Sequence, residues 1–143
     1  MKDLKLIVYS HSDVEDVLYP CVKRLEKYGW KNFCIFYDKK EAIENAKVFS
    51  YDDSFKYCDR VCSCLERMKE DLVLFTHEDF ILYDKPDYEK LESYVKKLKN
   101  SDRDFVRLIT TGETEGKRDG SLKEMPNDSD YIFAIQPTIW KRK

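Results

Sequence analysis

The sequence predicts an α/β fold, a three-layer sandwich with a mostly parallel sheet, and two observations carry the prediction. Segments rich in β-branched and aromatic residues alternate with helix-periodic segments along the chain, which is the pattern of βαβ units. Residues 4–10 are almost continuously apolar, as strands buried on both faces of a parallel sheet tend to be. The 143 residues suit one core, so we expect a single domain over residues 1–143.

A helix is predicted after this first strand, over residues 14–28. Ser12 and Glu15 have the spacing of a capping box at its start. Pro20 interrupts the apolar stripe, so we expect a kink or the start of a second helix there. Gly29 is suited to the left-handed conformation that often ends a helix.

The middle of the chain predicts two further strands and a second helix. Residues 33–37 form the second strand, 39–45 a short helical turn and 47–50 a short edge strand. Asp53 or Ser54 is expected to cap the following helix. The predicted apolar face of that helix is Phe55, Cys58, Cys62, Leu65 and Met68.

The second half continues the alternation. Residues 72–75 are a strand, and Asp87 is expected to cap a helix that turns Tyr88, Leu91, Val95 and Leu98 inward. Residues 105–109 are a strand, 111–130 a mobile loop rich in charge and glycine, and 131–136 the last strand. The chain stops just after an apolar segment, which suggests a truncated or unusually short member of its class.

Composition narrows the functional classes. The 26 basic and 28 acidic residues nearly cancel, for a net charge of −2, so nothing in the balance favours nucleic acid or an anionic membrane as a partner. No apolar run has the length of a transmembrane segment, and the N-terminal run is too short for a signal peptide. We therefore expect a cytoplasmic protein.

The five cysteines predict neither disulfides nor a zinc site. Their number is odd, and no Cys-x-x-Cys pair is present to begin a four-ligand zinc centre. Buried, reduced thiols that behave as small hydrophobic side chains are the favoured interpretation.

Polar residues follow three of the predicted strands at their carboxyl ends, where open α/β sheets bind ligands. Ser10 and His11 follow the first strand, and Asp38 follows the second. The strand at 72–75 leads into a third group at 77–79, His-Glu-Asp. Both histidines of the chain lie at such ends, which favours one shared crevice. For His11 alone, a role at the start of the helix is the favoured interpretation.

The acidic pair Glu78 and Asp79 suggests a divalent cation. Mg²⁺ and Mn²⁺ prefer carboxylate oxygen, often from one or two side chains together with substrate phosphates. For an isolated Glu-Asp pair, a solvated strand end or a helix cap is the ordinary alternative.

Residues 72–80, Leu-Val-Leu-Phe-Thr-His-Glu-Asp-Phe, resemble the strand and acidic motif of GT-A glycosyltransferases. The preceding helix, with Tyr57, Arg60 and Leu65, and the segment 131–142 are also similar to parts of some members. The opening residues 6–12 look like the first strand and nucleotide-contacting loop of that family. His77 stands where the commonest motif has an aspartate.

This resemblance implies a metal-dependent glycosyltransferase, or its donor-binding domain. The enzyme would transfer a sugar from a nucleotide-diphosphate donor to the hydroxyl of an unknown glycan, lipid or protein acceptor. Mn or Mg would be held by Asp79 with Glu78 or His77. The short C-terminus suggests that the acceptor-binding part is missing.

The resemblance also implies roles for individual residues. The nucleotide-sugar contacts would be Ser10, His11, Asp38, Arg60, Glu78, Gln136 and Trp140. Asp128 and Asp130 are candidates for the catalytic base, with a turn as their default interpretation. For Arg60, a solvated helix face is an equal alternative, and for Trp140 a place in the core is favoured.

Two other functions remain open. One is a non-catalytic, degenerate transferase-like module that binds a partner through a tyrosine-rich surface. The other is a metal-dependent nucleotidyl- or phosphotransferase. The chain has no glycine-rich phosphate loop and no Gly-x-Ser-x-Gly elbow, which argues against P-loop NTPases, dinucleotide-dependent dehydrogenases and α/β-hydrolases.

Overall fold

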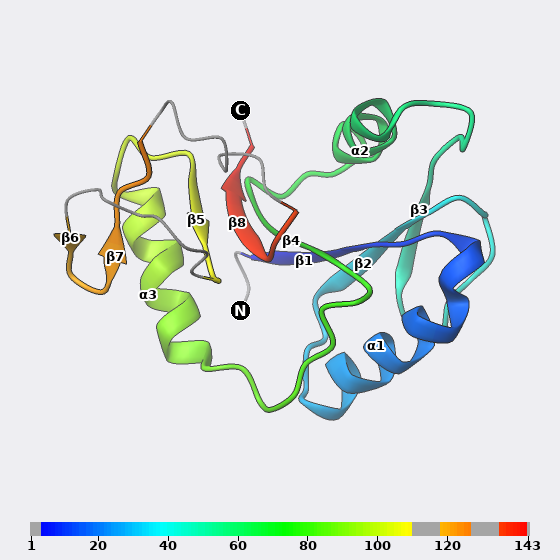
Figure 1. The fold of residues 1–143 in the computed structure, drawn as a ribbon, viewed down its shortest axis with the longest axis horizontal. Helices are drawn as coiled ribbons and strands as arrows, with labels where there is room; N and C mark the ends of the chain where they lie inside the picture. The colour runs from blue at the N-terminus through cyan, green and yellow to red at the C-terminus, as the bar shows by residue number, and fades with distance from the viewer. Residues whose placement is uncertain (1–3, 110–117, 127–134, 143) are drawn as a thin grey trace.

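The computed structural model of the protein describes residues 4–109, 118–126 and 135–142, and its main feature is a six-stranded sheet. The strands lie in the order β3-β2-β1-β4-β8-β5 (Figure 1). Their bounds are β1 Lys5–Tyr9, β2 Phe33–Tyr37, β3 Lys47–Ser50, β4 Leu72–His77, β5 Phe105–Arg107 and β8 Thr138–Lys141. Strands β1 to β4 are mutually parallel, and β8 is antiparallel to both β4 and β5. The predicted, mostly parallel sheet is therefore confirmed.

Helices cover both faces of this sheet. They are the 3-10 turn η1 Ser12–Val14 and the α-helices α1 Glu15–Lys27, α2 Tyr57–Leu65 and α3 Tyr88–Lys99. In Figure 1, α1 and α2 lie on opposite sides of the strands, and α3 lies beside β5. No helix in the described ranges has both the length and the apolar character needed to cross a bilayer.

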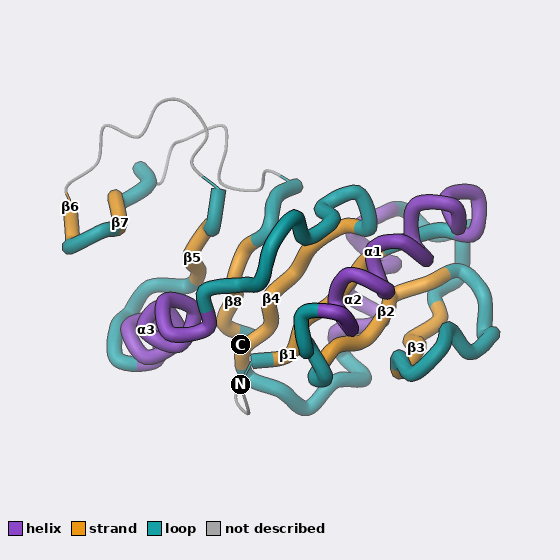
Figure 2. Tube along the Cα trace, turned by 90° about the horizontal axis from the view of Figure 1, so that it is seen from below, coloured by secondary structure: helices purple, strands orange, loops and turns teal. Residues whose placement is uncertain are grey.

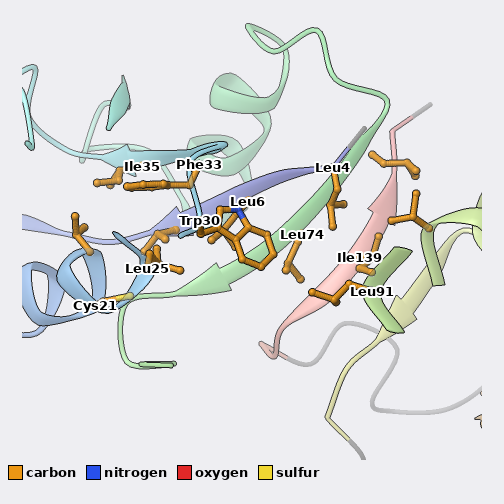
Figure 3. Close-up of a cluster of buried hydrophobic side chains, with 14 of the residues drawn as sticks. Leu4, Leu6, Cys21, Leu25, Trp30, Phe33, Ile35, Leu74, Leu91 and Ile139 are labelled. Carbon is orange, nitrogen blue, oxygen red and sulfur yellow. The ribbon is translucent and has the colours of Figure 1, made fainter. Parts of the chain in front are cut away.

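The two-residue period of the buried strands divides the core into two clusters. In the larger cluster, Leu6 and Leu74 of the sheet pack with Leu25 of α1 and Leu91 of α3 (Figure 3). The smaller cluster joins the opposite side chains of the sheet to the α2 region, and includes Ile7, Tyr9, Val73, Cys64 and Met68. The sheet thus lies between α1 and α3 on one face and α2 on the other, which gives the three layers expected.

Helix α1 runs unbroken through Pro20, so the alternative of a second helix that begins there is wrong. The missing N–H of an interior proline costs about 3 kcal/mol. Burial of Leu18, Cys21, Val22 and Leu25 on the same helix offsets this cost, at roughly 1.5–3 kcal/mol for each large apolar side chain. Gly29 follows the helix end with φ +78°, as predicted.

The predicted capping box at the start of α1 does not form. His11 caps the preceding turn, since its Nδ1 accepts the backbone N–H of Asp13 at 3.1 Å. The Ser12 hydroxyl donates instead to Asp38, a partner that sequence spacing along one helix does not reveal.

Helix α2 begins later and faces differently from the prediction. Neither Asp53 nor Ser54 caps it: its N-cap is Lys56, which makes no side-chain cap. Cys58 and Cys62 are exposed, and within the helix only Cys64 is fully buried. The sequence contains two overlapping apolar stripes, and packing against the sheet selects the stripe that contains Val61, Cys64, Leu65 and Met68.

Residues 39–45 form no helix. An isolated antiparallel bridge joins Ile43 to Ala46, and Ile43 is buried in the larger cluster. The third helix agrees with its prediction: the Asp87 carboxylate accepts the N–H of Lys90 at 2.9 Å, and Leu91, Val95 and Leu98 are buried.

The C-terminal third differs most from the prediction. Within the supposed loop 111–130, strands β6 Arg118–Asp119 and β7 Leu122–Lys123 pair as a hairpin, with Gly120 at φ +63° in its turn. The hairpin lies apart from the main sheet, beyond β5 (Figure 2). The last described strand is Thr138–Lys141, and residues 135 and 136 of the predicted strand 131–136 are not part of it, because Pro137 cannot donate to a strand ladder and pairing starts after it. Residues 131–134 lie outside the described part.

Candidate functional site

The order of strands reverses between β1 and β4. From β1 the chain adds β2 and β3 on one side and then returns to place β4 on the other. Tyr9 pairs with His77 at the carboxyl ends of these two strands, and the Glu78 N–H donates to the Tyr9 carbonyl at 3.3 Å. The segments that begin at Ser10 and Glu78 therefore leave the sheet side by side, where open α/β sheets form ligand crevices.

Two side-chain oxygens at this reversal are buried without a hydrogen-bond partner among the described residues. They are Oγ of Ser10, whose residue is 1% exposed, and Oε2 of Glu78. Burial raises the pKa of the Glu78 carboxyl, and the nearby Asp79 charge acts in the same direction. A hydrogen bond from the backbone of Glu78 itself and the charge of His11 oppose this rise. A buried polar group without a partner costs about 1–3 kcal/mol, and most buried polar groups of folded proteins are paired, so these two atoms call for an explanation.

Asp38, at the end of β2, is held by Ser12. Its carboxylate accepts the Ser12 backbone N–H at 2.7 Å and the Ser12 hydroxyl at 2.6 Å. Burial by itself would raise the pKa of Asp38, but these hydrogen bonds outweigh burial and lower it. Asp38 is therefore a fixed carboxylate beside the loop that follows β1. The role of Ser12 was missed, although its position just past a strand end was a usable signal.

His11 connects three segments of the chain. Its Nδ1 accepts the Asp13 N–H, so in the neutral ring Nε2 carries the proton. Nε2 lies 3.2 Å from Asp53 Oδ1 and 3.8 Å from Asp38 Oδ2. The imidazole thus links the end of β1 to the end of β2 and to the loop before α2, rather than only starting a helix.

Arg60 shapes that loop from a partly exposed position on α2. Its Nη1 lies 2.7 Å from Asp53 Oδ1, and its Nε donates to the Phe55 carbonyl at 2.6 Å. The guanidinium also lies over the Tyr51 ring, 5.5 Å from the centroid. A phosphate could reach Arg60 only by displacing some of these contacts.

His77 contacts two tyrosines on the α2 side of the sheet. Its Nε2 lies 3.0 Å from the Tyr57 hydroxyl, and its ring centroid is 5.1 Å from that of Tyr9. Burial lowers the pKa of His77, partly opposed by the Asp79 charge. Sequence reasoning missed Tyr57 as the partner of His77, because the contact joins two elements.

The carboxylate of Glu78 acts electrostatically on groups of both neighbouring helices, since it contributes to raising the pKa of Tyr57 in α2 as well as that of Cys21 in α1. The charges of Glu78 and Asp79 add to burial in raising the pKa of the Cys21 thiol to about 12. In the described ranges, no three histidine, cysteine, aspartate or glutamate side chains come together as a metal site. Oxygen ligands suit Mg²⁺ and Mn²⁺, so Glu78 and Asp79 together with ligand phosphates are a donor set that could hold either ion. The Nε2 of His77 is engaged by Tyr57, so a metal at His77 would have to use Nδ1.

Of the remaining candidate residues, Gln136 and Trp140 lie toward opposite ends of β4. Gln136 precedes β8 close to the carboxyl end of β4, since Thr138 pairs with Phe75. Its Oε1 is buried with no hydrogen-bond partner among the described residues. Trp140 pairs with Val73, nearer the other end of β4, and its ring packs 4.7 Å from Phe105. Asp128 and Asp130 lie outside the described residues.

A scan against protein-family models finds no match to this sequence, and a search of curated proteins also finds none. Functional assignment therefore depends on the chemistry of the strand ends described above.

Proposed function

We propose that the protein is a metal-dependent glycosyltransferase, or the donor-binding domain of one, and that it binds a nucleotide-diphosphate sugar where β1, β2 and β4 end. One observation carries the proposal. Ser10 Oγ and Glu78 Oε2 are buried, without a partner among the described residues, on adjacent strand ends at the reversal of strand order. A polar ligand bound at these strand ends would satisfy both groups.

The carboxylates at the strand ends have different proposed roles. Glu78 and Asp79 would hold Mn²⁺ or Mg²⁺ against the diphosphate, since their two carboxylates suit a cation that also takes phosphate oxygens. When bound, the cation would neutralise the charge on the departing nucleoside diphosphate, and this would favour transfer of the sugar to an acceptor hydroxyl.

Asp38 and Ser10 are suited to the uncharged part of the donor. A carboxylate has about four lone-pair positions, and Ser12 occupies two of those of Asp38. The others could accept ribose hydroxyls or the N–H groups of a base. The Ser10 hydroxyl can both donate and accept. Gln136 supplies an amide at the β8 side of the same edge.

Calorimetry with UDP, GDP and a panel of nucleotide sugars, with and without Mn²⁺, tests the proposal. We expect binding that requires the metal and that weakens at least about tenfold in Asp79→Ala, because loss of even one charged contact costs roughly 1.5–3 kcal/mol. Asp102→Ala, at an exposed turn before β5, is the matched control and should bind normally. Absence of binding across the panel would remove the basis of the proposal.

Catalysis is tested separately from binding. The contact between His77 and Tyr57 is compatible with the alternative of a binding module without turnover, because it engages one ring nitrogen of an expected metal ligand. Hydrolysis of a bound donor in the presence of Mn²⁺ identifies an active transferase, and binding without hydrolysis identifies the module. Release of pyrophosphate from a nucleoside triphosphate would instead indicate nucleotidyl transfer.

A further inference from the structure

Two cysteines of α2 are exposed, and the role of small hydrophobic side chains does not account for them. Cys58 and Cys62 are exposed, whereas Cys21, Cys34 and Cys64 are buried. The buried thiols fill the core, and the Cys64 thiol donates to the Phe49 carbonyl at 3.5 Å. The exposed pair needs another explanation.

The pair has the spacing of neighbours on one helix face. Cys58 and Cys62 are separated by four positions in the continuous helix Tyr57–Leu65. Residues so spaced have Cβ atoms roughly 5–6 Å apart and project in the same direction. Two sulfur atoms bound to one metal, each at about 2.3 Å, lie at most about 4.6 Å apart, a separation that this Cβ spacing allows.

The chemistry of the two thiol ligands determines which kind of metal ion they would bind. In the described part of the chain no third histidine, cysteine or carboxylate joins the pair to complete a metal site, so a four-ligand zinc centre is not formed within it. Thiolate is a soft ligand that favours Cu(I) over hard cations such as Mg²⁺ and Ca²⁺. A monovalent ion that is satisfied by two sulfur ligands matches both properties.

We propose that Cys58 and Cys62 form a two-thiolate site for a soft monovalent cation of the Cu(I) type. Each thiol loses its proton as its sulfur coordinates the metal, so binding releases two protons and leaves the oxidation state of the metal unchanged. The site lies on the solvent side of α2 and does not depend on the proposed nucleotide function.

Anaerobic titration of the full reduced chain with Cu(I), in competition with a chromogenic Cu(I) chelator, tests the site. The expected result is one tightly bound Cu(I) per chain, on a monomer, measured by native mass spectrometry. Changes to groups around a metal ligand commonly cost 10–100-fold in affinity, so loss of a ligand in Cys58→Ser or Cys62→Ser should cost at least about 100-fold. Because both side chains are exposed, thermal melting of the variants should match that of the wild type.

A control variant keeps the number of thiols and changes only their spacing. Cys62→Ser combined with Ser63→Cys places the second thiol five positions from the first, on another side of the helix. This double variant should lose the tight site. The proposal is overturned if the double variant or Cys58→Ser binds Cu(I) as tightly as the wild type, if no tight site exists, or if Cu(I) is bound only between two chains.

Discussion

Glu78 and Ser10 combine burial with unmet hydrogen-bonding capacity, and this combination ties the candidate site to the stability of the fold. The raised pKa of Glu78 means that the folded chain binds its proton more tightly than the unfolded chain. The stabilising contribution of this proton is therefore complete below the unfolded pKa and is lost as pH rises through the folded pKa. The charged carboxylate weakens the apo protein at neutral pH.

Glu78→Gln should accordingly stabilise the ligand-free protein at neutral pH and have little effect in acid. We expect a rise in Tm of roughly 2–4 °C at pH 7.5, equivalent to about 1 kcal/mol, that shrinks as the pH falls toward the pKa of an unfolded glutamate. Thermal melts at several pH values measure it. Glu92→Gln, on the exposed side of α3, provides the control. An effect of Glu78→Gln that is independent of pH would contradict the account of its pKa.

Hydroxyl deletions at Ser10 and Thr138 should have opposite effects. Both residues are buried, but the Thr138 hydroxyl donates to the Gln136 carbonyl at 2.8 Å, whereas the Ser10 hydroxyl has no partner in the described chain. Ser10→Ala should leave the free energy of unfolding unchanged or raise it by up to about 1 kcal/mol, while Thr138→Val should lower it by about 1 kcal/mol. Urea unfolding distinguishes them. A large loss in Ser10→Ala would show that this hydroxyl is already bonded in the apo protein.

Pro20 destabilises helix α1 locally, and the packing of the helix against the core outweighs this cost. Pro20 is exposed, and its neighbours at Leu18 and Cys21 are buried. The residue therefore costs a helix hydrogen bond without contributing core contacts.

Pro20→Ala should stabilise the protein because it restores the N–H that bonds the carbonyl four residues earlier. The gain should be about 1–3 kcal/mol, reduced by the greater freedom of the unfolded chain. Unfolding in guanidinium chloride measures it, and Pro86→Ala, in the loop before α3, is the comparison that restores no interior helix bond. Equal stability of Pro20→Ala and the wild type would mean that the helix has already adapted to the proline.

The whole molecule is organised by a sheet that is buried on both faces, and this predicts how its thiols react. Three cysteines belong to the two core clusters or to the strands between them, and two lie outside on α2. Core groups become accessible only when the protein opens, at a free energy that approaches that of global unfolding.

Native alkylation followed by mass spectrometry should therefore show two rapid adducts and three slow ones. Cys58 and Cys62 should react at the rate of a free thiol in solution. The buried thiols should react more slowly by orders of magnitude until denaturant is added. The variant Cys58→Ser with Cys62→Ser should show no rapid adduct. Rapid labelling of Cys34, which is fully buried in β2, would contradict the packing of the sheet.

Predictions from the sequence succeeded where the local pattern of residues is compatible with only one secondary structure. The runs at β1, β2 and β4, the Asp87 cap and Gly29 each combine a period with a matching end signal, so their identity could be predicted from neighbouring residues alone. The same local rules placed Ser10, His11, Asp38, Glu78 and Asp79 at strand ends, since the carboxyl end of a strand can be read from its sequence.

The tertiary structure determined those side-chain contacts whose partners are far apart in the sequence. Ser12 could cap a helix or bind Asp38, and only the parallel pairing of β1 with β2 brings that carboxylate within 2.6 Å. The partner of His77 Nε2 is also set by the position of α2 over the sheet, which brings the Tyr57 hydroxyl to 3.0 Å. Likewise, either apolar stripe of α2 satisfies a helical period, and the free energy of burial against the sheet determines which cysteines face water. Local sequence specifies backbone preference, whereas side-chain partners follow from packing between segments far apart in the chain.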